Sequence, residues 1–280
     1  MSKKISQKLR IELNSSDADT RIQALKEIVH LQRKDALLTV SVCLHDTNKF
    51  VRSAALELLV ELTGVAYSSE IIDILGDPSE FVRHRAVQTL QKLDVFQLEV
   101  LLSEKSHPNF FVRANLAKLL EDKQSEAVYS TLITLLQDQN EFVRQSAAKS
   151  LGGCGYTEAV PHLIKLLDDQ SPVVRYLSAR SLGQLRDLRA LNPLLNTLEN
   201  ETHLLVRIGI IYGLGGMIDE RAAQALLSVA FDPKENLNVQ TTVVTALAIM
   251  DKFGEITLKQ IAAEAPQSAV RADARNALNI

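Results

Sequence analysis

One step recurs along the whole sequence: an arginine, replaced once by glutamine and usually preceded by valine, returns every 30–33 residues. Seven residues after each step stands a large aliphatic residue, isoleucine at the first and leucine at the other eight. Two features that keep one register over nearly the whole chain indicate a solenoid of stacked supersecondary units. We call the nine positions rungs: Arg21, Arg52, Arg83, Arg113, Arg144, Arg175, Arg207, Gln240 and Arg271.

Each repeat is predicted to contain two helices, and residues 157–185 show the pattern most clearly. In the first half, apolar residues recur at i, i+3, i+4 and i+7, which is one helical face, and Pro161 falls in the first turn, where its missing N–H costs nothing. The second helix is predicted to stop at Gly183. We therefore predict an all-α fold, an α–α superhelix of about nine two-helix repeats of ~31 residues, as a single domain over 1–280.

The repeat also carries a family resemblance. Its pattern is Asp-x-x-x-x-Val-Arg-x-x-Ala-x-x-x-Leu-Gly, preceded by Ala-Val-Pro-x-Leu-Ile-x-Leu-Leu. This pattern resembles the short HEAT-like repeat, often called the PBS-lyase HEAT-like repeat, over essentially all of 1–280 and most strongly over 125–217. The resemblance implies an α-solenoid whose second helices line a concave face.

The rung arginines have a structural interpretation and a functional alternative. In the repeats that this chain resembles, the arginine pairs with an aspartate near the preceding turn, in its own or an adjacent repeat. Four aspartates stand six residues before a rung: Asp46, Asp77, Asp138 and Asp169 precede Arg52, Arg83, Arg144 and Arg175. We favour a ladder of charge-assisted pairs that orients the repeats over an anion-binding stripe. Arg113 stands out, because His107 replaces the aspartate of its repeat.

An aromatic strip accompanies four rungs. Phenylalanine stands two residues before the arginine at Phe50, Phe81, Phe111 and Phe142. On a helical wheel this position lies away from the Val/Leu face, so we expect it near the mouth of the inter-helix turn. Such a strip would either stack between adjacent repeats, which we favour, or grip an apolar segment of a partner.

The best candidate for a partner-binding site lies on the second helices of the sixth and seventh repeats. The residues expected on the concave face are mostly polar in earlier repeats and become apolar or aromatic here at Tyr176, Leu177, Ile208 and Tyr212, and Arg180 completes the predicted site. An exposed apolar patch usually marks a contact surface, although a tighter curve would bury these groups instead. The glycines at 209–216 indicate either close helix packing or a bendable segment.

No catalytic, metal or cofactor site is predicted. The six histidines form no zinc-ligand spacing and no His-Glu dipeptide, and no P-loop or Gly-x-Ser-x-Gly motif occurs. Cys154 lacks an evident helix N-terminus or cationic neighbour that would lower its pKa. The net charge of −3 and pI near 6.1 argue against nucleic acid as a partner. The lack of a secretory signal and of a long apolar run, together with two separated cysteines, favours a cytoplasmic protein without membrane contact.

These observations lead to three functional hypotheses. The first is a non-enzymatic scaffold or adaptor that binds a protein partner along its concave face. The second, implied only by the family resemblance, is a phycobiliprotein-associated factor: a bilin-lyase-like subunit, a chaperone or a disassembly factor. Of these three, the lyase-like subunit would be an enzyme. A remote third is nucleic-acid binding. We also expect self-association or partner docking at the C-terminal end, where Leu278, Asn279 and Ile280 end the last rung's helix.

Overall fold

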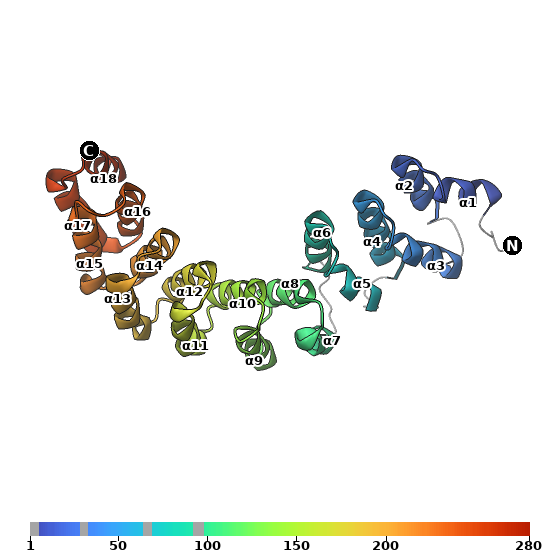
Figure 1. Cartoon of the computed structure of the whole chain (residues 1–280), viewed down its shortest axis with the longest axis horizontal. Helices are drawn as coiled ribbons and strands as arrows, with labels where there is room; N and C mark the ends of the chain where they lie inside the picture. The colour runs from blue at the N-terminus through green and yellow to red at the C-terminus, as the bar shows by residue number, and fades with distance from the viewer. Residues whose placement is uncertain (1–5, 29–32, 64–68, 92–97) are drawn as a thin grey trace. The chain divides into compact units, whose positions relative to one another are not determined.

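The computed structural model describes residues 6–28, 33–63, 69–91 and 98–280. All regular elements in these ranges are α-helices or short 3₁₀ helices (Figure 1), which confirms the predicted all-α repeat fold. The chain divides into two compact units, Met1–Leu119 and Leu120–Ile280, and each is described by itself. The prediction of one domain over 1–280 stays a prediction.

Unit 1 holds four helix pairs in chain order. Each first helix is followed by a second helix that carries a rung, and consecutive second helices pack on one another from α2 to α4 and from α4 to α6. The helices are α1 Gln7–Leu13, α2 Ala18–Glu27, α3 Arg33–Cys43, α4 Lys49–Thr63, α5 Ser69–Ile74, α6 Glu80–Gln91, α7 Leu98–Ser103 with η2 Glu104–Ser106, and α8 Phe110–Leu120, whose last residue opens unit 2.

Unit 2 holds five further pairs. The second helices α10, α12, α14, α16 and α18 follow one another along the inner side of its curve, and the first helices lie on the outer side (Figure 1). The bounds are α9 Glu126–Leu135, α10 Glu141–Cys154, η3 Thr157–Ala159, α11 Val160–Lys165, η4 Leu166–Asp168, α12 Pro172–Leu185, η5 Leu188–Ala190, α13 Leu191–Asn200, α14 Leu204–Gly216, α15 Glu220–Phe231, α16 Leu237–Leu247, α17 Asp251–Glu264 and α18 Ser268–Leu278.

Helix α10 shows why these residues form these elements. Asn140 caps its N-terminus by accepting the Phe142 N–H, and Gly155 ends it in the left-handed region at φ 70°. Between them Val143, Ala147 and Leu151 recur at four-residue spacing and are fully buried. A small residue three positions after the rung is buried in these described repeats: Ala24, Ala55, Ala86, Ala147, Ser178 and Ala274.

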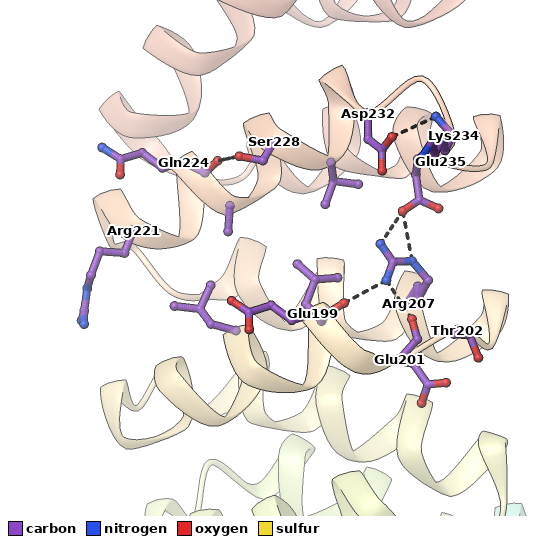
Figure 2. A pocket seen from close by; sticks show the side chains of 14 residues that line it. Glu199, Glu201, Thr202, Arg207, Arg221, Gln224, Ser228, Asp232, Lys234 and Glu235 are labelled. Atoms are coloured by element: carbon purple, nitrogen blue, oxygen red, sulfur yellow. Dashed lines mark hydrogen bonds and ion pairs between the residues drawn. The ribbon is translucent and has the colours of Figure 1, made fainter.

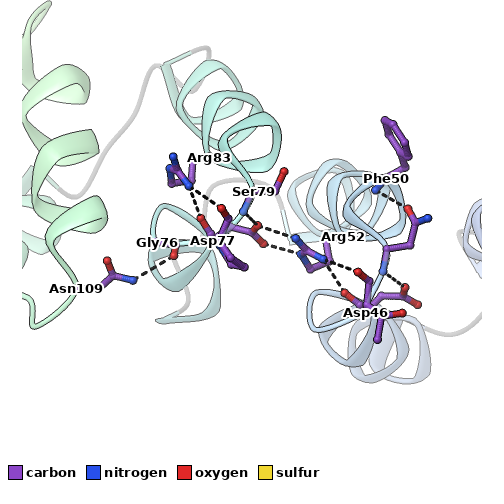
Figure 3. A network of polar contacts seen from close by, with 11 residues as sticks. Asp46, Phe50, Arg52, Gly76, Asp77, Ser79, Arg83 and Asn109 are labelled. Carbon is purple, nitrogen blue, oxygen red and sulfur yellow. Dashed lines mark hydrogen bonds and ion pairs between the residues drawn. The ribbon is translucent and has the colours of Figure 1, made fainter. Parts of the chain in front are cut away.

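The rung arginines link each repeat to the next (Figure 3). Arg52 donates from Nε and Nη2 to the two carboxylate oxygens of Asp77, at 2.6 and 2.7 Å, while its Nη1 donates to the Asp46 and Thr47 carbonyls of its own turn. The side chains of Arg52 and Asp77 are 11% and 3% exposed, so the pair is buried. The structure therefore resolves the predicted alternatives: the carboxylate comes from the following repeat, and the rung's own repeat supplies backbone carbonyls.

The same arrangement recurs along both units. Among the described residues, rungs pair with a carboxylate of the following turn: Arg21 with Asp46, Arg52 with Asp77, Arg144 with Asp169, Arg175 with Glu201 and Arg207 with Glu235. Burial opposes ionisation of Asp46, but hydrogen bonds from Arg21 and the Asn48 N–H outweigh it, so the pKa of Asp46 is lowered. Asp138 accepts from the Asn140 N–H and offers its carbonyl to Arg144. These contacts join each of these repeats to the next, and the orienting role of the ladder stays a prediction.

Gln240 shows how the ladder changes when the acid is missing. Twenty-five residues after this rung stands Ala265, at the ladder position that holds Asp77 relative to Arg52. Gln240 is fully buried, and its amide donates to the Asp232 carbonyl at 2.7 Å and the Ala230 carbonyl at 3.3 Å. A neutral side chain thus serves the carbonyls of its own turn without burying an unpaired charge.

His107 stands where other repeats have the ladder aspartate, and this replacement affects a different rung arginine from the one predicted. Because the acid pairs with the rung of the preceding repeat, the replacement affects Arg83 and not Arg113. No carboxylate among the described residues pairs with Arg83, whose Nη1 donates to the Asp77 and Pro78 carbonyls at 2.7 and 3.1 Å (Figure 3). Arg113 makes the equivalent contacts to the His107 and Pro108 carbonyls.

Glycines bring α12 and α14 into backbone contact. A Cβ on Gly213 would lie 2.5 Å from the Ala179 carbonyl oxygen, and one on Gly183 would lie 2.7 Å from the Gly213 Cα. Helix α12 was predicted to stop at Gly183. It continues instead to Leu185, and Arg186 adopts the left-handed conformation. Gly183 is needed for the close approach of the neighbouring helix, and of the two interpretations of the 209–216 glycines the structure supports close packing.

Candidate functional site

The predicted partner-binding residues gather on the surface formed by α12 and α14. Tyr176 and Arg180 stand one turn apart on α12, and Tyr212 comes from α14. The Arg180 guanidinium lies 5.6 Å from the Tyr176 ring centre and 5.4 Å from the Tyr212 ring centre. We call these three residues the Tyr–Arg–Tyr cluster. It brings together one arginine and the aromatic rings of two consecutive repeats.

Arg180 keeps most of its hydrogen-bonding capacity. Its Nη1 donates to the Tyr176 hydroxyl at 3.0 Å, and no ion pair of the described residues includes it. Arg180 is exposed, and both tyrosines are partly exposed. A guanidinium carries five N–H donors, so the cluster offers directed donors beside two aromatic rings.

The other predicted site residues lie beside this cluster. Leu177 and Ile208 are partly exposed, on α12 and α14 respectively. Tyr176 covers Gly209, where a Cβ would lie 2.8 Å from the Tyr176 carbonyl oxygen. The curve of the unit therefore does not bury the patch, and the close helix contact fixes the spacing of the two tyrosines.

The aromatic strip lies at the starts of second helices, near the inter-helix turns. In unit 1 the Phe50 and Phe81 rings meet edge to face with centres 5.3 Å apart, although the residues are 51% and 42% exposed. Phe111 lies under the Arg83 guanidinium. In unit 2 Phe142 is 51% exposed at the start of α10. The Phe50 and Phe81 rings thus stack between repeats, and about half of the surface of each residue is still exposed to solvent.

A cleft of about 830 Å³ lies between α13 and α15 on the outer side of unit 2 (Figure 2). Leu195, Leu198 and Val229 contribute apolar lining, and Arg207, paired with Glu235, lies at one end. Nη1 of Arg207 is already used by the Leu198 and Glu201 carbonyls. Sequence reasoning missed this cleft. The one available signal in the sequence was that glutamate replaces aspartate at two ladder positions, where the inter-helix turns are also longer.

The chemistry of the remaining candidates is limited. No three His, Cys, Asp or Glu side chains within the described ranges gather so as to hold a metal ion. None of the helices in those ranges is long and apolar enough to cross a membrane. At the C-terminal end Ile280 is 77% exposed, while exposed side chains of α18 include Arg275 and Asn276. Self-association there stays a prediction.

We expect Cys154 to react slowly with alkylating agents at neutral pH. Burial, with the nearby Glu121 and Asp122 carboxylates, raises the pKa of its thiol to about 11 from an ordinary 9.0, and the thiol donates to the Glu121 carbonyl at 3.0 Å. Because the thiolate reacts, labelling by iodoacetamide in a Cys43→Ala background should be about a hundredfold slower than for a free thiol at neutral pH. A rate close to that of free cysteine would contradict this account.

Comparisons with known proteins agree with this architecture. The family model described as HEAT repeats matches residues 6–91, 98–183, 143–212, 160–235 and 191–279. No curated protein matches the chain.

Similar solved structures come from larger proteins. A Kap121p mutant has a TM-score of 0.61 and 14% identity, with 97% of this chain and 37% of that one covered. Kap95 in the Kap95:Nup1 complex has a TM-score of 0.58 and 14% identity, with 95% and 45% covered. Kap95p with RanGDP has a TM-score of 0.58 and 13% identity, with 99% and 47% covered. At these identities the likeness shows the fold alone, and the chain spans less than half of each protein.

Proposed function

The chain belongs to the HEAT-repeat family, and we propose from this premise that it is a non-enzymatic scaffold that binds a protein partner through the α12–α14 surface. The observation that carries the proposal is the Tyr–Arg–Tyr cluster, because exposed Arg180 lies 5.6 and 5.4 Å from two partly exposed rings and pairs with no carboxylate of the described residues. Rung arginines such as Arg52 and Arg144 serve a different purpose, since their donors are used between repeats. The cluster is therefore the better candidate for recognition.

Its composition fits a protein surface. Tyrosine and arginine are enriched at the energetic centres of protein interfaces, where rings exclude water and the guanidinium forms directed hydrogen bonds. Leu177 and Ile208 extend the apolar area on either helix. Two structures of similar fold are of Kap95 with Nup1 and Kap95p with RanGDP, which supports a protein as the class of partner here.

Affinity capture with the intact chain and with an Arg180→Gln/Tyr212→Ala variant tests the proposal. A captured protein, once purified, should bind the variant at least about tenfold more weakly, because a hydrogen bond to a charged group contributes about 1.5–3 kcal/mol. Arg189→Gln is the matched control, since Arg189 is exposed on η5 and pairs with Asp187. Equal affinity of wild type and variant would sink the proposal.

The bilin-related alternative rests on the resemblance of the repeat and predicts a different ligand at the same cluster. A tetrapyrrole would place its rings against the tyrosines and a propionate at Arg180. Titration of the wild-type chain with free bilin, followed by absorbance, separates the two hypotheses. A shift that Arg180→Gln abolishes would favour the alternative, whereas an unchanged spectrum would leave the scaffold.

A further inference from the structure

Arg83 is a rung whose ladder acid has been replaced. Six residues before the following rung stands His107, whose Nδ1 accepts the Asn109 N–H at 3.1 Å, as Asp46 accepts from Asn48 in an earlier turn. The Nε2 of His107 lies 3.6 Å from Asp73. Histidine thus reproduces the turn-stabilising contact of the aspartate but supplies no carboxylate to Arg83.

The guanidinium of Arg83 is nevertheless held in place. Its Nη1 donates to two carbonyls of its own turn, and its Cζ lies 3.8 Å from the centre of the Phe111 ring. No hydrogen bond from its Nε or Nη2, the atoms with which Arg52 binds Asp77, is made to a described residue. Two charge-assisted donors are thus positioned in advance and unused within the described chain.

Apolar surface lies along the same helix starts. Phe50 and Phe81 are about half exposed, and the Lys49 ammonium lies 5.1 and 5.9 Å from their ring centres. Lys49 takes part in no ion pair of the described residues. We call Lys49, Phe50, Phe81, Arg83 and Phe111 the N-terminal edge. It combines exposed rings with two cations, and Glu80 is the exposed carboxylate adjacent to it in sequence.

We propose that the N-terminal edge binds an extended partner segment in which acidic residues alternate with large apolar ones. A partner carboxylate at Arg83 would take the place of the missing ladder acid, in the bidentate geometry that Asp77 shows at Arg52. An apolar side chain would cover Phe81, and a second carboxylate would lie near Lys49. This site goes beyond the proposed function, since it lies in unit 1, whereas the Tyr–Arg–Tyr cluster lies in unit 2.

The test uses a fluorescein-labelled peptide in which Asp or Glu alternates with Leu or Phe, titrated with the intact chain and followed by anisotropy. Arg83→Gln should weaken binding about tenfold, because it removes a charge-assisted contact. Glutamine is the matched replacement, since Gln240 already serves the carbonyls of its turn at another rung. Phe81→Ser should also weaken binding, and Glu80→Gln should strengthen it.

A second comparison needs no variant. The same peptide with Asn and Gln in place of its acids should lose about tenfold or more in affinity for the wild-type chain. Equal binding of the neutral peptide, unchanged binding by a folded Arg83→Gln chain, or no binding of the acidic peptide would each overturn the proposal. Arg180→Gln should leave this affinity unchanged, so failure here is distinguishable from failure of the proposed function.

Discussion

Replacing Asp77 by alanine is expected to lower the free energy of unfolding by about 3–5 kcal/mol, because one member of a buried ion pair is lost. Arg52 would stay buried with its Nε and Nη2 donors unpaired, and the Ser79 N–H would lose the Asp77 oxygen that accepts it at 2.7 Å. Urea unfolding followed by circular dichroism measures the loss. A cost under about 1 kcal/mol, as for an exposed pair, would contradict the buried ladder.

A second substitution serves as the control for that result. In the Asp77→Ala background, Arg52→Gln should recover part of the stability, because it removes the unpaired charge and can still donate to the turn carbonyls. The chain already contains this combination as Gln240 and Ala265. If the double variant were as unstable as Asp77→Ala or less stable, the loss would not come from an unpaired guanidinium.

Gly213→Ala is expected to cost about 3 kcal/mol or more, at the upper end of what overpacking costs. The added Cβ would lie 2.5 Å from the Ala179 carbonyl oxygen and 3.3 Å from the Leu194 side chain. Since the nearest atom belongs to the backbone of α12, relief requires the two helices to separate. The urea midpoint should fall, and amide exchange along α12 and α14 should accelerate.

Gly153→Ala is the matched control within unit 2. The Cβ there would meet the Glu121 side chain, which can move aside, and the residue is exposed in α10. Gly153 lies in the last turn of α10, where the preference of a helix for alanine over glycine is at most about 1 kcal/mol, so this variant should be unchanged or slightly more stable. Equal losses in the two variants would contradict the specific role given to the α12–α14 contact.

The repeat could be predicted because its register is periodic, and the same periodicity concealed the direction of the ladder. An aspartate six residues before one rung is also twenty-five residues after the previous one, as Asp77 is for Arg83 and Arg52. Spacing alone cannot decide which of the two arginines receives the carboxylate. Because of this ambiguity, the effect of His107 was assigned to Arg113. In the structure it is Arg83 that pairs with no carboxylate of the described residues.

The candidate site was predictable only in part. Equivalent positions on consecutive second helices must lie side by side, which brings Arg180 and Tyr212 together, since each stands five residues after its rung. That Arg180 also comes within 5.6 Å of the Tyr176 ring centre depends on side-chain conformations that no sequence pattern encodes. The α13–α15 cleft was missed because its walls come from first helices, whose residues share no recurring chemical signal. The stop predicted at Gly183 was wrong because a glycine also permits close helix packing.

The affinity of a captured, purified partner for Arg180→Gln tests the central claim most directly: the rungs hold the repeats together, and the Tyr–Arg–Tyr cluster is left for recognition. Calorimetric titration should show binding at least about tenfold weaker than wild type. The urea midpoint should stay unchanged, because Arg180 is exposed and pairs with no carboxylate of the described chain. Wild-type affinity in the folded variant would contradict the account.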